Sequence, residues 1–252
     1  MENKNYSSKA FAIFVFIIFF FTLVPNSYGV SYSDVVIDGD LSDWDINDSL
    51  GSRNGAELGF TWDEENLYFY WSGTDLSSSE EGADLFFYLS TNNSGSNKSK
   101  SWNFVEHNLP FAANYAFSIE DSNYYEFSEW NGTAWSIKES DDVEVYVGWS
   151  GNKISEIKLP LNYLGNPANV SLIVWSQWQD EANVWATFPT LNSASETGSE
   201  YFTHYYNTSL SEGITSSEIL ILSNALKLDD AINLAIVFHQ HQPYYKNKVT
   251  NF

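Results

Sequence analysis

Two histidines near the C-terminal end of the chain have the residue type and spacing best suited to chemistry. They lie in His239-Gln-His-Gln-Pro243, directly after the apolar run Leu234–Phe238. The run has no turn former, which is typical of a strand buried on both faces. Residues two apart on a strand share a face, so His239 and His241 are predicted to point the same way. Pro243 would end the strand and leave both imidazoles at its tip, where α/β barrels place their sites.

The same motif resembles the first conserved motif of family-57 glycoside hydrolases, which act on α-glucans such as starch and pullulan. The resemblance implies that His239, His241 and Gln242 belong to the substrate-binding part of a catalytic domain. In that family the Glu nucleophile and the Asp acid/base lie in motifs far downstream. Retaining hydrolysis needs two carboxyl groups roughly 5–5.5 Å apart, and the printed sequence has no Asp or Glu after His241. We therefore expect no catalytic residue in this chain, and no activity from it alone.

Two other interpretations of the histidine pair remain open. A His-x-His sequence can arise by chance on a surface strand, and two histidines on one face can ligate a metal. The metal interpretation lacks a third ligand nearby in the sequence.

The N-terminal segment has the pattern of an export signal. Lys4 and Lys9 precede the apolar run Ala10–Val24, and small residues follow it at Ser27 and Gly29. This pattern predicts a secretory signal over residues 1–29, cut after Gly29, and hence a secreted or cell-surface protein with no stable membrane span. The run is shorter than the roughly 20 residues that cross a bilayer, so an uncleaved anchor is the weaker alternative.

The composition restricts the partners. The formal net charge of −22 disfavours nucleic-acid backbones and favours neutral ligands or cations. There is no cysteine, so an exported domain cannot be held by disulfides. It must be stabilised by packing, or by packing together with bound ions. Asn-x-Ser/Thr acceptors, which suit an exported protein with many loops, occur at Asn47, Asn92, Asn97, Asn131, Asn169 and Asn207.

Between about residues 35 and 206 the chain consists of short alternating segments separated by Gly, Asn, Asp and Ser. This pattern predicts an all-β protein with a jelly-roll or immunoglobulin-like β-sandwich. The expected organisation is a signal helix over 1–29, the sandwich over 30–210, and a linker over 211–231 that contains a short helix or a last strand. Residues 232–252 would be the truncated start of the catalytic domain, with the orphan first strand of a (β/α) barrel.

The start of the predicted sandwich also has a recognisable sequence. Val36-Ile-Asp-Gly-Asp-Leu-Ser-Asp-Trp44 and Phe60-Thr-Trp-Asp-Glu-Glu-Asn-Leu-Tyr68 are similar to the opening of family-9-type carbohydrate-binding modules. A related domain occurs in glucodextranases and amylopullulanases. The resemblance implies a jelly-roll-like sandwich that accompanies a glycoside hydrolase and contacts polysaccharide.

Carboxylates gather in the first of these segments. Asp38, Asp40 and Asp43, with Asp45 beside them, are oxygen ligands of the kind that Ca²⁺ prefers. Asp side chains also bond backbone N–H groups at turns, and this turn role is the favoured interpretation. Structural calcium is thus the one cofactor considered, and none is required.

Aromatic residues are the candidates for sugar binding, since sugars present apolar faces rimmed by hydroxyls. In Trp175-Ser-Gln-Trp-Gln179, an inward Trp175 would put Trp178 on the opposite face, beside Gln177 and Gln179. Trp130 and Trp135 bracket a turn and form a second candidate cluster. Strand parity places other tryptophans in the core, namely Trp44, Trp62, Trp71 and Trp149.

Taken together, these patterns favour the exported N-terminal portion of an α-glucan-acting glycoside hydrolase. The alternative is a non-catalytic cell-surface protein that binds sugar or mediates adhesion.

Overall fold

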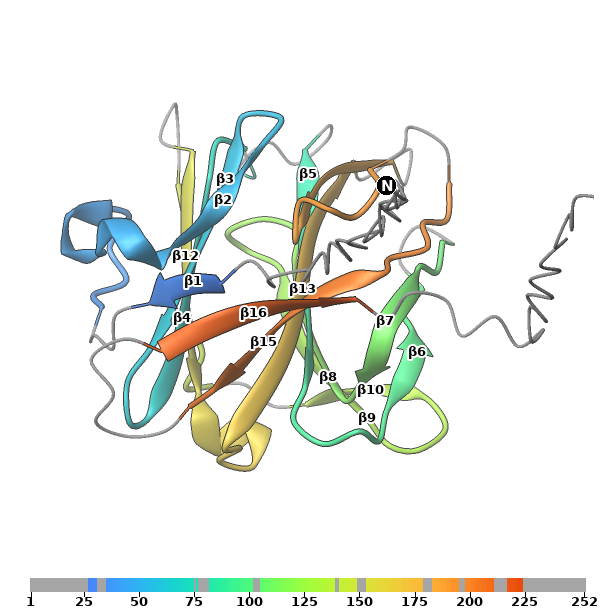
Figure 1. Ribbon diagram of the computed structural model, residues 1–252. Coiled ribbons are helices and arrows are strands. Elements are labelled where there is room, and N and C mark those ends of the chain that lie inside the picture. Colours follow the sequence, from blue (N-terminus) through green and yellow to red (C-terminus); the bar gives the residue numbers. More distant parts are fainter. Residues whose placement is uncertain are drawn as a thin grey trace, which may run out of the picture.

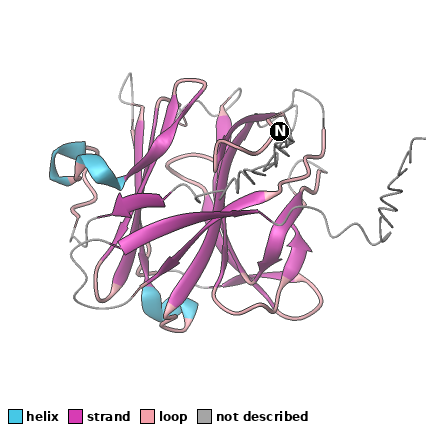
Figure 2. Cartoon of the chain, in the orientation of Figure 1, coloured by secondary structure: helices cyan, strands magenta, loops and turns pink. Residues whose placement is uncertain are grey.

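The computed structural model describes residues 27–30, 35–74, 76, 82–101, 105–138, 141–148, 153–178, 183–194, 198–210 and 217–223. Within these ranges the chain is strands and turns, with three short 3-10 helices (Figure 2). The prediction of an all-β sandwich is confirmed. Most of the expected signal helix, and the whole orphan strand of the expected barrel, lie outside the described residues. Among those that are described, no helix has the length and apolar character needed to cross a membrane.

The larger of the two main sheets is antiparallel and spans most of the chain (Figure 1). Its strand order is β1 (Ser27–Val30), β16 (Ser217–Ser223), β15 (His204–Ser209), β13 (Asn169–Trp178), β5 (Ala83–Ser90), β8 (Tyr115–Ile119), β9 (Tyr125–Trp130) and β10 (Trp135–Lys138). Strand β14 (Val184–Phe188) also pairs with β13. The ten-residue β13 thus connects β5 on one side with β14 and β15 on the other.

The second sheet is also antiparallel. Its order is β11 (Glu144–Val147), β12 (Ile154–Pro160), β4 (Asn66–Ser72), β3 (Ala56–Trp62) and β2 (Ser49–Arg53). The β2–β3 turn is an Asn-Gly pair in which Asn54 has φ 53° and Gly55 φ 81°. Positive φ at both central residues is the requirement of a tight type I′ hairpin, which Asn-Gly meets at little cost.

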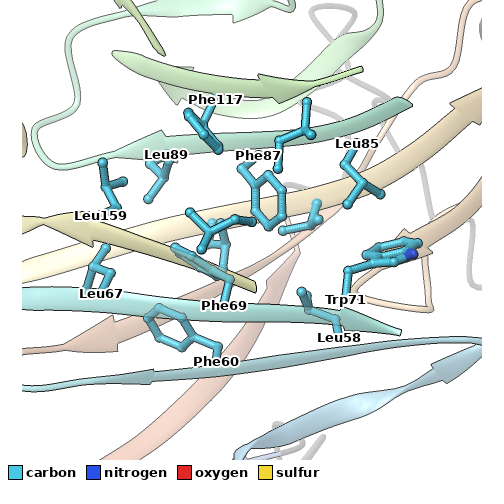
Figure 3. Packing of buried hydrophobic residues seen from close by; sticks show 14 of the residues in the cluster. Leu58, Phe60, Leu67, Phe69, Trp71, Leu85, Phe87, Leu89, Phe117 and Leu159 are labelled. Atoms are coloured by element: carbon cyan, nitrogen blue, oxygen red, sulfur yellow. The ribbon is translucent and has the colours of Figure 1, made fainter. Parts of the chain in front are cut away.

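The main core lies between the two sheets and is built from the alternation seen in the sequence. Phe69 of β4 stacks on Phe60 with ring centroids 5.0 Å apart and meets Phe87 of the opposite sheet at 5.2 Å. Figure 3 shows these rings with leucines on both sides. Trp71 packs edge-on against Phe188 at 5.3 Å. Burial of each such ring stabilises the fold by about 1.5–3 kcal/mol.

A second core lies on the outer face of the large sheet. Trp175 of β13 stacks on Tyr88 at 4.9 Å and contacts Phe202 at 5.0 Å. The hairpin of β6 (Ser96–Lys98) and β7 (Asn108–Ala113) supplies Leu109 and Ala113 to this cluster. The middle of β5 and β13 is therefore buried on both faces, which explains why neither strand has a polar face there.

The sandwich continues beyond the boundary predicted at residue 210. Ser217–Ser223, expected in the linker, forms strand β16 and pairs with β15 on one side and β1 on the other. Of the two states left open for this segment, the strand is the one observed. The cut predicted after Gly29 falls inside β1.

Three 3-10 helices complete the described residues. They are η1 (Leu41–Asp43), η2 (Ile46–Asp48) and η3 (Leu161–Leu164). The first two belong to residues 36–48, here called the Asp-rich segment. This segment crosses the outer face of the second sheet near Glu156.

Candidate functional site

Two tryptophans meet on the surface at the C-terminal end of β13. Trp178 ends that strand and Trp185 lies on the neighbouring β14, with ring centroids 5.8 Å apart and planes at 72°. The side chains stay 37% and 41% exposed. Large aromatic side chains usually bury far more of their surface, so this edge-to-face pair is an unusual surface feature.

A β-bulge aims Trp185 at its partner. Ser176 pairs with Ala186, but the next residue Gln177 pairs with Val184, so Trp185 is an extra residue between two successive pairs. Ala186 packs in the main core and Val184 in the second core. Because its two neighbours are buried on opposite faces of the sheet, the bulged Trp185 is left outside both cores. Bulges are known to re-aim single side chains in this way.

The β2–β3 turn holds β14 from the opposite sheet. Asn54 Nδ2 donates to the Trp185 carbonyl at 2.6 Å. Arg53 Nη1 donates to Thr187 Oγ1 at 2.9 Å, and to the carbonyls of Thr190 and Asn192 at 3.1 and 2.5 Å. At the other side, the Trp178 N–H closes the hairpin by donating to the Asn183 carbonyl at 2.9 Å. The backbone of Trp185 is therefore tied to the β2–β3 turn, and that of Trp178 to its own hairpin.

Gln177 was predicted to lie beside Trp178 on the surface, and this prediction is wrong. Gln177 is 1% exposed, because it lies two residues after Trp175 on a regular stretch of β13 and so shares the outer face of the sheet with that ring. Its Oε1 lies 2.7 Å from His107 Nε2. The error arose because Trp175 was expected to face the main core, whereas both Trp175 and Gln177 face the second one.

The buried His107 has a defined tautomer. Its Nδ1 accepts a hydrogen bond from the Glu200 backbone N–H at 2.9 Å, so the ring proton resides on Nε2 and is donated to Gln177 Oε1. Burial lowers the pKa of His107, against opposing effects of the Gln177 bond and the negative charge of Glu200. The imidazole is thus a neutral structural link that joins the residue before β7 to Gln177 of β13 and to the backbone of Glu200.

The second predicted cluster does form. Trp130 and Trp135 are directly paired across β9 and β10, with ring centroids 5.6 Å apart. Trp135 also packs edge-on against Tyr88 at 5.5 Å and borders the second core. Both residues are more buried than Trp178 and Trp185, so this pair offers less free surface.

The predicted Asp cluster makes turns. Asp38 Oδ1 accepts from the Asp40 N–H, Asp40 Oδ1 from the Ser42 N–H, and Asp43 Oδ2 from the Val36 N–H, at 2.7–3.0 Å. The carboxylates therefore bond separate backbone groups. In the part of the chain that the structure describes, no group of three or more His, Cys, Asp or Glu side chains is placed to hold a metal ion.

This Asp-rich segment is fastened to the second sheet by a buried carboxylate. Glu156 of β12 accepts from the N–H groups of Asp38 at 3.1 Å and Gly39 at 2.5 Å, and from Trp44 Nε1 at 2.8 Å. Burial raises the pKa of Glu156, and the three donors oppose that shift. Trp44 is half-buried edge-on against Tyr70, so it covers the outer face of this sheet and not the main core.

Several predicted site residues lie outside the described ranges, namely Gln179, His239, His241 and Gln242, as does Trp149, which was predicted in the core. Conversely, two residues of interest were not singled out in the sequence. Trp185 sits in an ordinary alternating strand, and no local signal marks its bulge. His107 is an isolated histidine whose partners are 70 and 93 residues away.

No protein-family model matches the chain, and no curated protein sequence does either. Two solved structures of a carbohydrate binding module family 9 (CBM9) from Caldicellulosiruptor kristjanssonii are similar to it. The structure in complex with glucose is 12% identical with a TM-score of 0.39, over 73% of this chain and 97% of that chain. The structure in complex with cellotriose is 13% identical with a TM-score of 0.40, over 69% of this chain and 92% of that chain.

Proposed function

We propose that this chain is a carbohydrate-binding β-sandwich that contacts a neutral polysaccharide through Trp178 and Trp185. The observation that carries the proposal is the exposed pair itself, two indoles aimed at each other by a bulge and held by a turn from the opposite sheet. Exposed aromatic rings of this kind present an apolar face with a polar N–H at the rim. A pyranose, with apolar C–H faces and surrounding hydroxyls, is the complementary ligand.

The charge of the chain supports a neutral ligand. With a formal net charge of −22, the surface repels phosphate, sulfate and carboxylate groups at long range. Uncharged glycans avoid this repulsion, whereas nucleic acids and acidic polysaccharides do not.

At finer resolution, the proposed protein is the exported N-terminal portion of an α-glucan-acting enzyme of the family-57 glycoside hydrolase type. His239-Gln-His-Gln-Pro243 supports this assignment, as does the signal-like segment over residues 1–29. The sandwich would then hold the enzyme on its polymeric substrate. Reading the encoding DNA beyond codon 252 in three frames tests the proposal, which fails if no Glu- and Asp-bearing barrel motifs follow.

Binding is tested by retention of the full-length chain on insoluble starch and on cellulose, with parent, Trp178→Ala and Trp185→Ala compared. Central aromatic anchors typically contribute about 2 kcal/mol or more to binding, so each variant should bind roughly thirtyfold more weakly. The matched control is Tyr201→Ala, at an exposed aromatic of a different segment. Retention of both tryptophan variants at the parent level would refute the proposed surface. If the natural ligand is an α-glucan, the chain should be retained more strongly on starch than on cellulose.

A further inference from the structure

A polar hollow lies on the outer face of the large sheet, at the other end of β13 from the tryptophan pair. Three side chains form one rank across neighbouring strands there, because Ser171 of β13 pairs with Ser90 of β5 and with Asn207 of β15. Neighbouring strands are about 4.8 Å apart, so the rank spans roughly 10 Å. Asn169, two residues before Ser171, points to the same face.

The hollow has a volume of about 270 Å³ and is lined only by uncharged side chains. They are Ser90, Thr91, Asn92, Asn93, Asn169, Ser171 and Asn207. In a chain with 33 acidic and 11 basic residues, a concave surface without charge is distinctive. It excludes an ion as the favoured ligand, and the lack of apolar lining disfavours a lipid or a flat aromatic ring.

The lining has hydrogen-bonding capacity that the described protein does not use. Ser90 is only 6% exposed, yet no protein partner of its hydroxyl is found among the described residues. The amides of Asn93 and Asn169 likewise make no side-chain bond within the described ranges. Asn207 Nδ2 donates to Ser171 Oγ at 2.9 Å, which leaves Asn207 Oδ1 available as an acceptor.

One wall is preorganised. The buried Asn114 accepts from the Thr91 N–H with its Oδ1 at 3.0 Å and donates to Thr91 Oγ1 with its Nδ2 at 3.0 Å. Thr91 Oγ1 accepts this bond, so its hydroxyl proton remains available to a ligand in the hollow that Thr91 lines. Donors and acceptors from three strands and one turn thus surround a single small space.

We propose that this hollow is a second carbohydrate contact site, which takes one sugar ring through hydrogen bonds to its hydroxyls. The inference rests on the proposed function for the class of ligand and is independent of the tryptophans. Trp178 is nine positions after Asn169 on β13, a distance of about 30 Å at 3.3–3.4 Å per residue. Because nine is odd, the two side chains leave opposite faces of the strand, and the hollow and the tryptophan pair are therefore separate sites. Without an aromatic platform the hollow binds a single sugar weakly, with Kd in the millimolar range.

Covalent modification must be separated from binding in the test. Asn92, Asn169 and Asn207 each begin an Asn-x-Ser/Thr acceptor sequence, so an N-linked glycan on any of them would obstruct the hollow. The chain is therefore produced in a host without N-glycosylation, and its intact mass is measured before use.

The experiment titrates glucose into the ¹⁵N-labelled full-length chain and follows backbone and side-chain amide shifts by NMR. Saturating shifts are expected at Ser90, Ser171 and Asn207, and separately at the indoles of Trp178 and Trp185. Ser90→Ala and Asn169→Ala remove groups without a protein partner in the described chain, so folding should be retained. Each variant should weaken the glucose affinity reported by the shifts at the hollow at least fivefold. The affinity reported by the two indoles should stay unchanged. Asn97→Ala, at an exposed asparagine of β6, is the matched control.

The outcomes separate the two sites. Shifts at the hollow that are absent, or that rise linearly without saturation, overturn the inference. It is also overturned if Ser90→Ala and Asn169→Ala titrate like the parent. Loss of the indole shifts alone counts against the proposed tryptophan site and leaves the hollow standing.

Discussion

Replacing His107 by Asn should cost stability in a pH-dependent manner. The Asn oxygen can still accept from the Glu200 N–H, but the bond from Nε2 to Gln177 Oε1 is lost. A buried acceptor left without a donor costs about 1–3 kcal/mol. The missing ring atoms, which pack against Trp175 and Phe202, add about 1 kcal/mol as a cavity. We expect a total loss of about 2–4 kcal/mol at pH 7.5.

The pH dependence follows from the direction of the pKa shift. Burial lowers the pKa of His107 in the folded chain below the ordinary value of 6.5. Below pH 6.5 the unfolded chain takes up a proton that the folded chain does not. The stability from neutral His107 is therefore complete above pH 6.5 and falls as the pH decreases, by at most about 1.4 kcal/mol per pH unit. The variant lacks this loss, so its deficit relative to the parent should shrink toward pH 5, by up to about 2 kcal/mol.

The assay is urea unfolding of both chains at pH 7.5 and pH 5, followed by tryptophan fluorescence. The dependence of the unfolding free energy on urea concentration is measured for each chain and each pH. Titration of other groups is common to both chains and cancels in the difference. The matched control is His204→Asn, at a half-exposed histidine of β15. A deficit for His107→Asn that is equal or larger at pH 5 would refute the assignment of a neutral, buried imidazole.

Three further predictions concern Gly39, Arg53 and the Asp-rich turns. Gly39→Ala should lower stability by more than about 2 kcal/mol, because φ is +82° and a Cβ would lie 2.2 Å from the Tyr146 ring. Gly132→Ala is the control, because φ is +99° there and a Cβ would meet no atom, so this variant measures the backbone strain alone. Equal losses of stability in the two variants by thermal unfolding would rule out the clash with Tyr146. Arg53→Lys should lower the free energy of unfolding by about 1–2 kcal/mol, since an ammonium cannot reproduce the three bonds to β14 and the turn after it; an unchanged Tm would contradict this. Adding Ca²⁺ or a chelator should leave Tm unchanged, because the Asp-rich turns use their carboxylates on backbone N–H groups; a clear rise with Ca²⁺ would revive the calcium interpretation.

The strands were predictable because their signal is local. In β4 and β5 apolar residues recur with a period of two, and the observed main core contains Leu67, Phe69 and Trp71 as that period requires. The opposite faces of these strands were equally informative. Phe86 and Tyr88 are large aromatic residues that alternate with Leu85 and Phe87, a pattern that fits burial on both sides of β5.

The candidate site was predictable only in part. Trp178 was identified from its spacing to Trp175, although the reason given for its exposure was wrong. Its partner Trp185 was missed, because exposure there depends on a bulge whose two neighbours are buried in different cores. The polar hollow was also missed, since its rank joins residues 90, 171 and 207, which only strand pairing brings together.

The sequence by itself determined an all-β chain, where most of its strands lie and, for β4 and β5, which side chains turn toward the main core, because alternation and turn residues act over a few residues. The tertiary structure decided what covers the other face of each sheet. The β6–β7 hairpin buries Trp175 and Gln177, which a single-layer interpretation would leave on the surface. The register of β14 leaves Trp185 outside, which alternation alone would not do. Both decisions depend on contacts between residues far apart in the chain, and local periodicity carries no information about them.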